Sequence, residues 1–258
     1  TVTIAAGHTA VSLAAAAGTN TTVDVGGQTV TGTWDLGDGT DVITATTGAN
    51  IAGVNSGNAT TAESITLTGA ITMTAAQLAP LTITATGGAD SVTLTTVATF
   101  TTSTAIESYA IVEGSTLTIA AGAKTITETG DAGTVSTFIL GTGVYTGAWV
   151  GIDAADVVKV VTGTNVAANT GLNGGVVFDF QSDTATLTLN PTQNGLATTF
   201  VNAGAGTQTI ALSEADTFTT NSAIESYTTL GASTVTIAAG HTAVSLAAAA
   251  GTNTTVDV

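Results

Sequence analysis

Threonine alternates with aliphatic residues in many short runs along this chain. Examples are TVTIAA at 1–6, ESITLTG at 63–69, LTITATG at 81–87 and STLTIAA at 115–121. A period of two is typical of a strand with one buried face, and Thr, Val and Ile have high strand propensity. Gly, Asn and Asp separate these runs, as in LGDGTD at 36–41, and they favour turns. The pattern predicts an all-β protein.

An exact repeat organises these runs. Residues 1–25 recur without a single change at 234–258, an offset of 233 residues. We therefore interpret the chain as a window on a longer array in which 234–258 begins the next repeat. No signal peptide is visible at Thr1, which indicates a mature or internal piece.

A weaker repeat lies inside the exact one. Between 1–51 and 116–166, 20 of the 51 aligned positions are identical. Further along, TFTTSTAIESY at 99–109 returns as TFTTNSAIESY at 217–227, at an offset of 118 instead of 115. An insertion of about three residues therefore lies between them, and we place it near NPTQNG at 190–195. The sequence predicts two related halves, 1–115 and 116–233.

Composition narrows the choice of β architecture. Thr (60), Ala (45) and Gly (31) fill more than half of the 258 positions, and aromatic residues make up only 4%. Large side chains normally supply much of a core, so these numbers favour a thin one. A β-solenoid of stacked short strands needs only a narrow core of small residues. We therefore predict a β-solenoid built from two related halves, with tandem β-sandwich domains as the alternative.

Charge and residue types exclude several functions. The net charge is −16, with two lysines and no arginine, so we expect no nucleic-acid partner. No apolar run reaches the length of a membrane span, and without cysteine there are no disulfides or zinc–thiolate sites. The only histidines, His8 and His241, occupy one repeat position. No catalytic triad, HExxH motif or phosphate loop is evident, and we predict that the chain is not an enzyme.

Aspartates after the two tryptophans are the strongest chemical candidates. Gly37–Ile43 fits G-x-G-x-D-x-U, the end of the nonapeptide that binds calcium in β-rolls. The equivalent stretch of the second half keeps two aspartates but loses both glycines. The alternative is that these side chains accept hydrogen bonds from turn amides. The candidate calcium ligands are Asp35, Asp38, Asp41, Asp153 and Asp156.

The recurrence of other residues indicates a structural role for them. Glu107 and Glu225 occur in AIESY of both halves, beside Tyr109 and Tyr227, which indicates a fixed structural task and not a catalytic pair. On a flat solenoid face, ranks of Thr-x-Thr could order water and bind ice, but Thr is also an ordinary exposed strand residue. Their spacing drifts along the chain, so ice binding stays a remote alternative.

A family resemblance is carried by three stretches. These are DLGDGTDVITATTGANI, ESITLTGAITMTAAQLAPLTITATGGADSVTL and AIESYAIVEGSTLTI. Their internal repeats, their composition and the degenerate G-x-D motifs between their strands resemble those of the very long β-strand-repeat surface proteins of bacteria. This group includes RTX-type adhesins and S-layer-like proteins. The resemblance implies a secreted, acidic, cysteine-free protein, often exported by a type I route. The iterated calcium nonapeptide of β-rolls is missing here.

From these observations we expect a structural tandem-repeat segment of an extracellular bacterial cell-surface fibre, sheath or adhesin stalk. Its partners would be copies of itself, joined by stacking or lateral contact. The alternative is an S-layer or adhesin module that binds calcium or surface glycans. Such a module would show aromatic or acidic side chains clustered on one face, for example near Trp34 and Trp149.

Overall fold

The computed structural model describes all residues except 38, 57–63, 131–132, 154, 173–175, 197–198, 202–205, 240, 242–243, 249–252 and 258. About 4% of the chain is helix, and parallel strands stack into a β-solenoid of about 11 turns. The predicted all-β solenoid is confirmed, and the parallel pairing excludes the sandwich alternative, whose sheets are antiparallel. By contacts the chain forms two compact units, Thr1–Val112 and Glu113–Val258.

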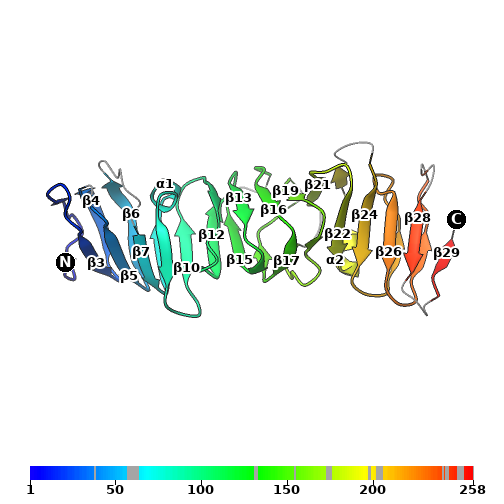
Figure 1. Ribbon diagram of the computed structural model, residues 1–258, viewed down its shortest axis with the longest axis horizontal. Helices are drawn as coiled ribbons and strands as arrows, with labels where there is room; N and C mark the ends of the chain where they lie inside the picture. Colours follow the sequence, from blue (N-terminus) through cyan, green and yellow to red (C-terminus); the bar gives the residue numbers. More distant parts are fainter. Residues whose placement is uncertain are drawn as a thin grey trace. The chain divides into compact units, whose positions relative to one another are not determined.

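In unit 1 (Thr1–Val112), successive strands alternate between two parallel sheets, so each coil gives one strand to each sheet (Figure 1). The first sheet contains β1 (Val2–Thr3), β3 (Thr22–Gly26), β5 (Val42–Thr46), β7 (Ser64–Thr68) and β9 (Thr82–Ala85). The second contains β2 (Leu13–Ala14), β4 (Thr29–Asp35), β6 (Ala49–Ser56), β8 (Ala70–Met73), β10 (Ser91–Leu94) and β12 (Ser108–Val112). Strand β11 (Thr99–Thr101) belongs to neither sheet.

In unit 2 (Glu113–Val258), the first coils place one strand in each of three sheets, and the later coils again alternate between two sides. One side holds a ladder of β13 (Thr116–Ile119), β16 (Thr137–Leu140), β19 (Val157–Val160), β21 (Val177–Phe180) and β23 (Thr199–Val201), and a separate sheet of β25 (Thr217–Thr219), β27 (Thr234–Thr236) and β29 (Thr255–Asp257). The other side holds β14 (Gly122–Ala123), β17 (Gly143–Thr146), β20 (Thr164–Asn165), β22 (Ala185–Leu189), β24 (Gln208–Leu212), β26 (Ser226–Thr229) and β28 (Ser245–Ala248). Strands β15 (Thr125–Thr129) and β18 (Trp149–Val150) form a further pair.

Each coil adds one inward residue to a column of stacked side chains. In unit 1, Val23 pairs with Ile43 and Ile43 with Ile65, and all three are buried. Because the pairing is in register, the period-two pattern of each strand points the same positions inward coil after coil. Thr fills the alternate positions, which is why the Thr–aliphatic alternation recurs throughout the sequence.

The aromatic residues are few, and every one of them lies inside. Phe138 pairs with Val158 and Val158 with Phe178, forming the matching column of unit 2. The buried aromatic side chains are Trp34, Phe100, Tyr109, Phe138, Tyr145, Trp149, Phe178, Phe180, Phe200, Phe218 and Tyr227. The aromatic surface cluster expected of a glycan-binding module near Trp34 and Trp149 is therefore absent, because both rings are buried in the core.

Both tryptophans follow a glycine that touches the preceding coil. Gly32 (φ +128°) and Gly147 (φ +113°) each precede a Trp by two positions. A Cβ on Gly32 would lie 2.1 Å from the carbonyl oxygen of Val11, and one on Gly147 would lie 2.4 Å from that of Lys124. Only glycine permits both this conformation and this approach.

Among the described residues, two short helices interrupt the succession of strands, one in each unit. Helix α1 (Ala75–Leu78) follows β8, and helix α2 (Pro191–Leu196) follows β22. The second lies where the sequence predicts the three-residue insertion. In the described part of the chain, no helix is long and apolar enough to cross a membrane.

Candidate functional site

Asp41 and Asp156 occupy one repeat position and are buried at the corners of their coils. Oδ1 of Asp41 accepts a hydrogen bond from the backbone N–H of Thr21 at 2.7 Å. Oδ1 of Asp156 accepts the equivalent bond from Ser136 at 2.8 Å. Each carboxylate thereby joins its own coil to the preceding one. These two aspartates therefore act as acceptors for turn amides, the alternative that the sequence left open.

The other three predicted ligands differ in their surroundings. Asp35 is exposed and accepts from the N–H of Gly37 at 3.2 Å, whereas Asp153 accepts from Ala155 at 2.8 Å. Asp38 lies outside the described residues. Across the described residues, no three His, Cys, Asp or Glu side chains group so that they could hold a metal ion. Calcium binding at these positions stays a prediction.

Glu107 and Glu225 perform the same structural task in the two units. Oε2 of Glu107 accepts from the backbone N–H of Asp90 at 2.9 Å, and Oε2 of Glu225 accepts from that of Gln208 at 2.7 Å. Asp90 and Gln208 are both fully buried and lie one coil earlier. Each glutamate thus ties two successive coils together.

The neighbouring tyrosines anchor the loop before their strand. The hydroxyl oxygen of Tyr109 accepts from the N–H of Ser103 at 2.8 Å, and that of Tyr227 accepts from Asn221 at 2.7 Å. Burial raises the pKa of both phenols to about 12. Both hydroxyls therefore stay protonated over the physiological range, and these AIESY segments are structural in both units.

A buried acidic cluster in unit 2 was not predicted from the sequence. Glu128 is only 7% exposed, and its Oε1 accepts a hydrogen bond from the hydroxyl of Ser136. The pKa of Glu128 is raised to about 7, chiefly by burial and in smaller part by the nearby charges of Asp156 and Glu113. Because Asp156 also accepts the backbone N–H of Ser136, one serine connects two carboxyl groups.

Each short helix is fixed to the coil before it by a glutamine at its third position. Nε2 of Gln77 donates to the carbonyl oxygens of Ile51 and Val54, both at 2.7 Å. Nε2 of Gln193 donates to Val166 at 2.8 Å and to Asn169 at 2.9 Å. The cap residues Thr74 and Asn190 complete reciprocal capping boxes with these glutamines.

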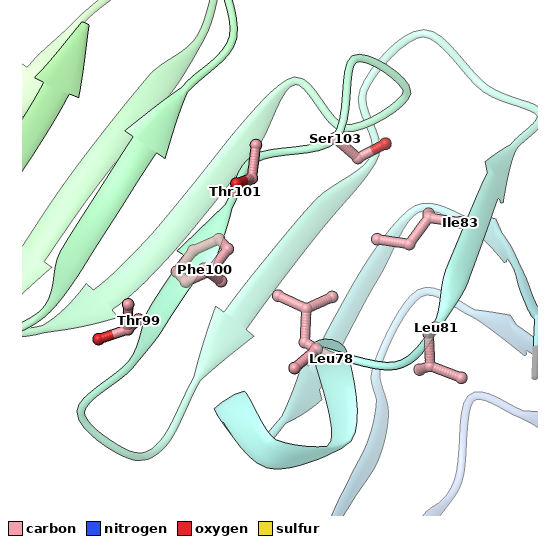
Figure 2. Close-up of a pocket in the computed structure, with 8 residues that line it drawn as sticks. Leu78, Leu81, Ile83, Thr99, Phe100, Thr101 and Ser103 are labelled. Carbon is pink, nitrogen blue, oxygen red and sulfur yellow. The ribbon is translucent and has the colours of Figure 1, made fainter. Parts of the chain in front are cut away.

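Beside helix α1 lies a cavity of about 340 Å³. Its apolar wall comes from Leu78 of α1, Ile83 of β9 and Phe100 of β11, whose side chains Figure 2 shows around a common space. Strand β9 ends its sheet, and β11 belongs to another, so the strand ladder is interrupted here. The helix and the aromatic ring occupy the break.

The same arrangement recurs beside helix α2, where the cavity measures about 390 Å³. Its wall includes Asn194 of α2, Phe200 of β23 and Phe218 of β25. Strand β23 ends one ladder and β25 begins another. Phe218 is the repeat equivalent of Phe100, so the break, the helix and the cavity belong to the repeat. This second cavity is more polar, since threonines and two asparagines line much of it.

Comparison with known proteins gives no relative. No family model, no curated protein and no solved structure matches the chain.

The sequence contains only weak signals for the sites that were not predicted from it. The helices contain four and six residues, too short for a helical period, and only the Thr74-x-x-Gln77 and Asn190-x-x-Gln193 spacing marks their starts. Glu128 stands two residues after buried Ile126, so the alternation itself places an acid at an inward position. The cavities had no signal, because they arise from a break between distant strands.

Proposed function

We propose that this chain is a structural tandem-repeat segment of a secreted bacterial cell-surface fibre, sheath or adhesin stalk. The observation that carries the proposal is the structural recurrence of the repeat. After 233 residues the same sequence returns and again forms parallel strands with the same pairing, β1 with β3 and β27 with β29. A coil that recurs in the same form can extend a solenoid by repetition.

The hydrogen-bond partners of the recurring polar side chains support a mechanical role. The recurring carboxylates, amides and phenols named above bind backbone groups of a neighbouring coil or loop, and all aromatic side chains are buried. These residues hold successive coils together, whereas a recognition surface would present such groups outward. The charge of −16 would keep such a stalk soluble outside the cell.

Electron microscopy of the native protein tests the proposal. We expect filaments whose features repeat with a period that corresponds to one 233-residue unit. Isolated globular particles at every concentration would contradict a fibre or stalk. A regular two-dimensional lattice would instead favour the S-layer alternative.

A binding module is the second candidate, and the duplicated cavities favour it. Leu78 and Phe100 give the cavity of unit 1 an apolar wall that would accept a small apolar group. An environment-sensitive hydrophobic dye distinguishes the two functions. Dye binding that is abolished by Leu78→Gln would support a binding module, whereas a stalk predicts no saturable binding.

A further inference from the structure

The cavities beside α1 and α2 carry different residues at matching positions. Leu78 follows the glutamine that fixes α1, whereas Asn194 follows the glutamine that fixes α2. Ser103 and Asn221 form a second matching pair, because each comes directly after a TFTT segment. At both positions unit 2 has a side-chain amide, which donates and accepts hydrogen bonds. The wall of the α2 cavity has therefore gained polar groups while the cavity itself is kept.

An acid and a second aromatic ring distinguish the α2 cavity further. Asp216 lines this cavity and stands where unit 1 has Ala98, directly before the TFTT segment. Its Oδ1 accepts the N–H of Thr217 at 2.7 Å, which orients the carboxylate. Phe200 takes the place of Ile83, since each is the inward residue of the last strand in its ladder. The α2 cavity thus has two phenyl rings and a carboxylate in its wall.

Both rings of the α2 cavity are held by further aromatic contacts. Phe200 stacks on Phe178 with ring centroids 5.9 Å apart, and Phe218 packs against Tyr227 at 5.1 Å. Oδ1 of Asn221 accepts the N–H of Ala223 at 3.0 Å, so this amide is oriented as well. The wall therefore combines fixed aromatic rings with oriented polar groups, and pre-organised groups bind a ligand at a smaller cost in entropy.

We propose that the α2 cavity binds a neutral sugar ring. Sugar hydroxyls donate to a carboxylate and exchange hydrogen bonds with amides and threonine hydroxyls, whereas the C–H groups of the ring pack against aromatic side chains. The volume of about 390 Å³ lies within the range of small-molecule sites, about 300–1,000 Å³. The proposal deepens the binding-module candidate and rests on it, because it names the ligand class and the cavity.

The charges around the cavity disfavour acidic sugars. The carboxylate of Asp216 is part of the wall, and the described residues that line the cavity include neither lysine of the chain. A uronic acid would bring a second carboxylate close to Asp216 without a cation to pair with it, and like charges in contact are unfavourable. The net charge of −16 opposes anions in general. We therefore expect neutral sugars to bind in preference to their uronic acids.

Saturation-transfer NMR of the unchanged protein tests the assignment. The probes are D-glucose, D-galactose, D-mannose and N-acetyl-D-glucosamine, and we expect saturable transfer to at least one of them. No transfer to any of the four would overturn the proposal. D-glucuronic and D-galacturonic acid are the matched acidic probes. Transfer to these acids equal to that of glucose and galactose would contradict a neutral-sugar site.

The cavity of unit 1 supplies the substitutions that locate the site. Asn194→Leu and Asp216→Ala introduce residues that the fold already carries at the matching positions, Leu78 and Ala98, so both variants should keep their strands in circular dichroism. Because they remove hydrogen bonds to the sugar, we expect the double variant to lower its affinity about tenfold or more. Unchanged affinity in the double variant would place binding elsewhere and overturn the proposal.

Leu78→Asn is the matched control, because it makes the opposite exchange in the cavity beside α1 (Figure 2). It should leave sugar affinity as it is in the unchanged protein. An equal loss of affinity in Leu78→Asn and Asn194→Leu would contradict a site beside α2.

The sugar site and the binding module fail in different ways. Saturable binding of the hydrophobic dye without transfer to any sugar would leave the binding module standing and overturn the sugar site. Absence of both signals would remove the binding module as well and leave the fibre role.

Discussion

The hydroxyl of Ser136 donates a hydrogen bond to Oε1 of Glu128 in the core of unit 2. The same serine donates its backbone N–H to Asp156, so two carboxyl groups meet at one residue of the neighbouring coil. Burial favours the neutral form of Glu128, as its raised pKa of about 7 indicates. Burial of this carboxyl group therefore links the stability of unit 2 to pH, whereas the hydrogen bond from Ser136 acts in the opposite direction and favours the charged form.

Stability of unit 2 should fall as pH rises towards and through 7. In the unfolded chain a glutamate ionises near its ordinary pKa of 4.5, whereas folded Glu128 keeps its proton up to a pH of about 7. Its contribution is therefore complete below pH 4.5 and is lost as pH rises through about 7. We expect Glu128→Gln, which mimics the protonated acid, to reduce this dependence. Thermal melts from acidic to mildly alkaline pH measure it.

Glu214 supplies the control for this experiment. It lies in the same unit and is exposed, so Glu214→Gln should leave the pH profile as it is. If Glu128→Gln and Glu214→Gln changed the profile alike, general charge repulsion and not the buried carboxyl would be the cause.

Removing the amide of Gln193 should destabilise unit 2. Its Nε2 donates to the carbonyl oxygens of Val166 and Asn169, and the residue is 3% exposed. Gln193→Ala leaves these carbonyls without their donor, at a cost of about 1–3 kcal/mol. Gln181 is exposed in the same unit, and Gln181→Ala should change the denaturation midpoint little. Equal midpoints for the two variants in urea would show that the helix is not held by this glutamine.

How far the sequence predicts this structure depends on the range of each interaction. The alternation that contains Val23 and Ile43 predicts the strands, since a strand is a local pattern, and the small residues predict a thin solenoid core. The partner of Asp41 was not predictable, because Thr21 lies a full coil away and only the register brings its N–H to the carboxylate. The cavity beside Phe100 could not be predicted from the sequence for the same reason, since it lies where two strand ladders do not pair.

A chelator should leave the melting temperature unchanged. Oδ1 of Asp41 and Oδ1 of Asp156 each accept a backbone N–H group, and such a bond can hold a turn without an ion. We therefore expect the same melting temperature in calcium and in excess chelator. A lower melting temperature in chelator would instead support calcium binding, and loss of that difference in Asp153→Asn would locate the ion.

Glycine should be required at position 32 and replaceable at position 88. Gly32 has φ +128°, and a Cβ there would lie 2.1 Å from the carbonyl oxygen of Val11. The same carbonyl accepts the indole N–H of Trp34 at 3.0 Å, so a shift of the backbone also disturbs a buried ring. Gly32→Ala should therefore destabilise unit 1 by about 2 kcal/mol or more, since it combines steric overlap with an unfavourable backbone conformation.

At Gly88 a Cβ would meet nothing within 4 Å, and the stability of Gly88→Ala should lie within about 0.5 kcal/mol of that of the unchanged protein. Urea denaturation followed by the fluorescence of Trp34, in a Trp149→Phe background, reports on unit 1. Equal midpoints for the two alanine variants would mean that the coils can separate at Gly32 without cost, contrary to the close contact on which the stacking of this solenoid depends.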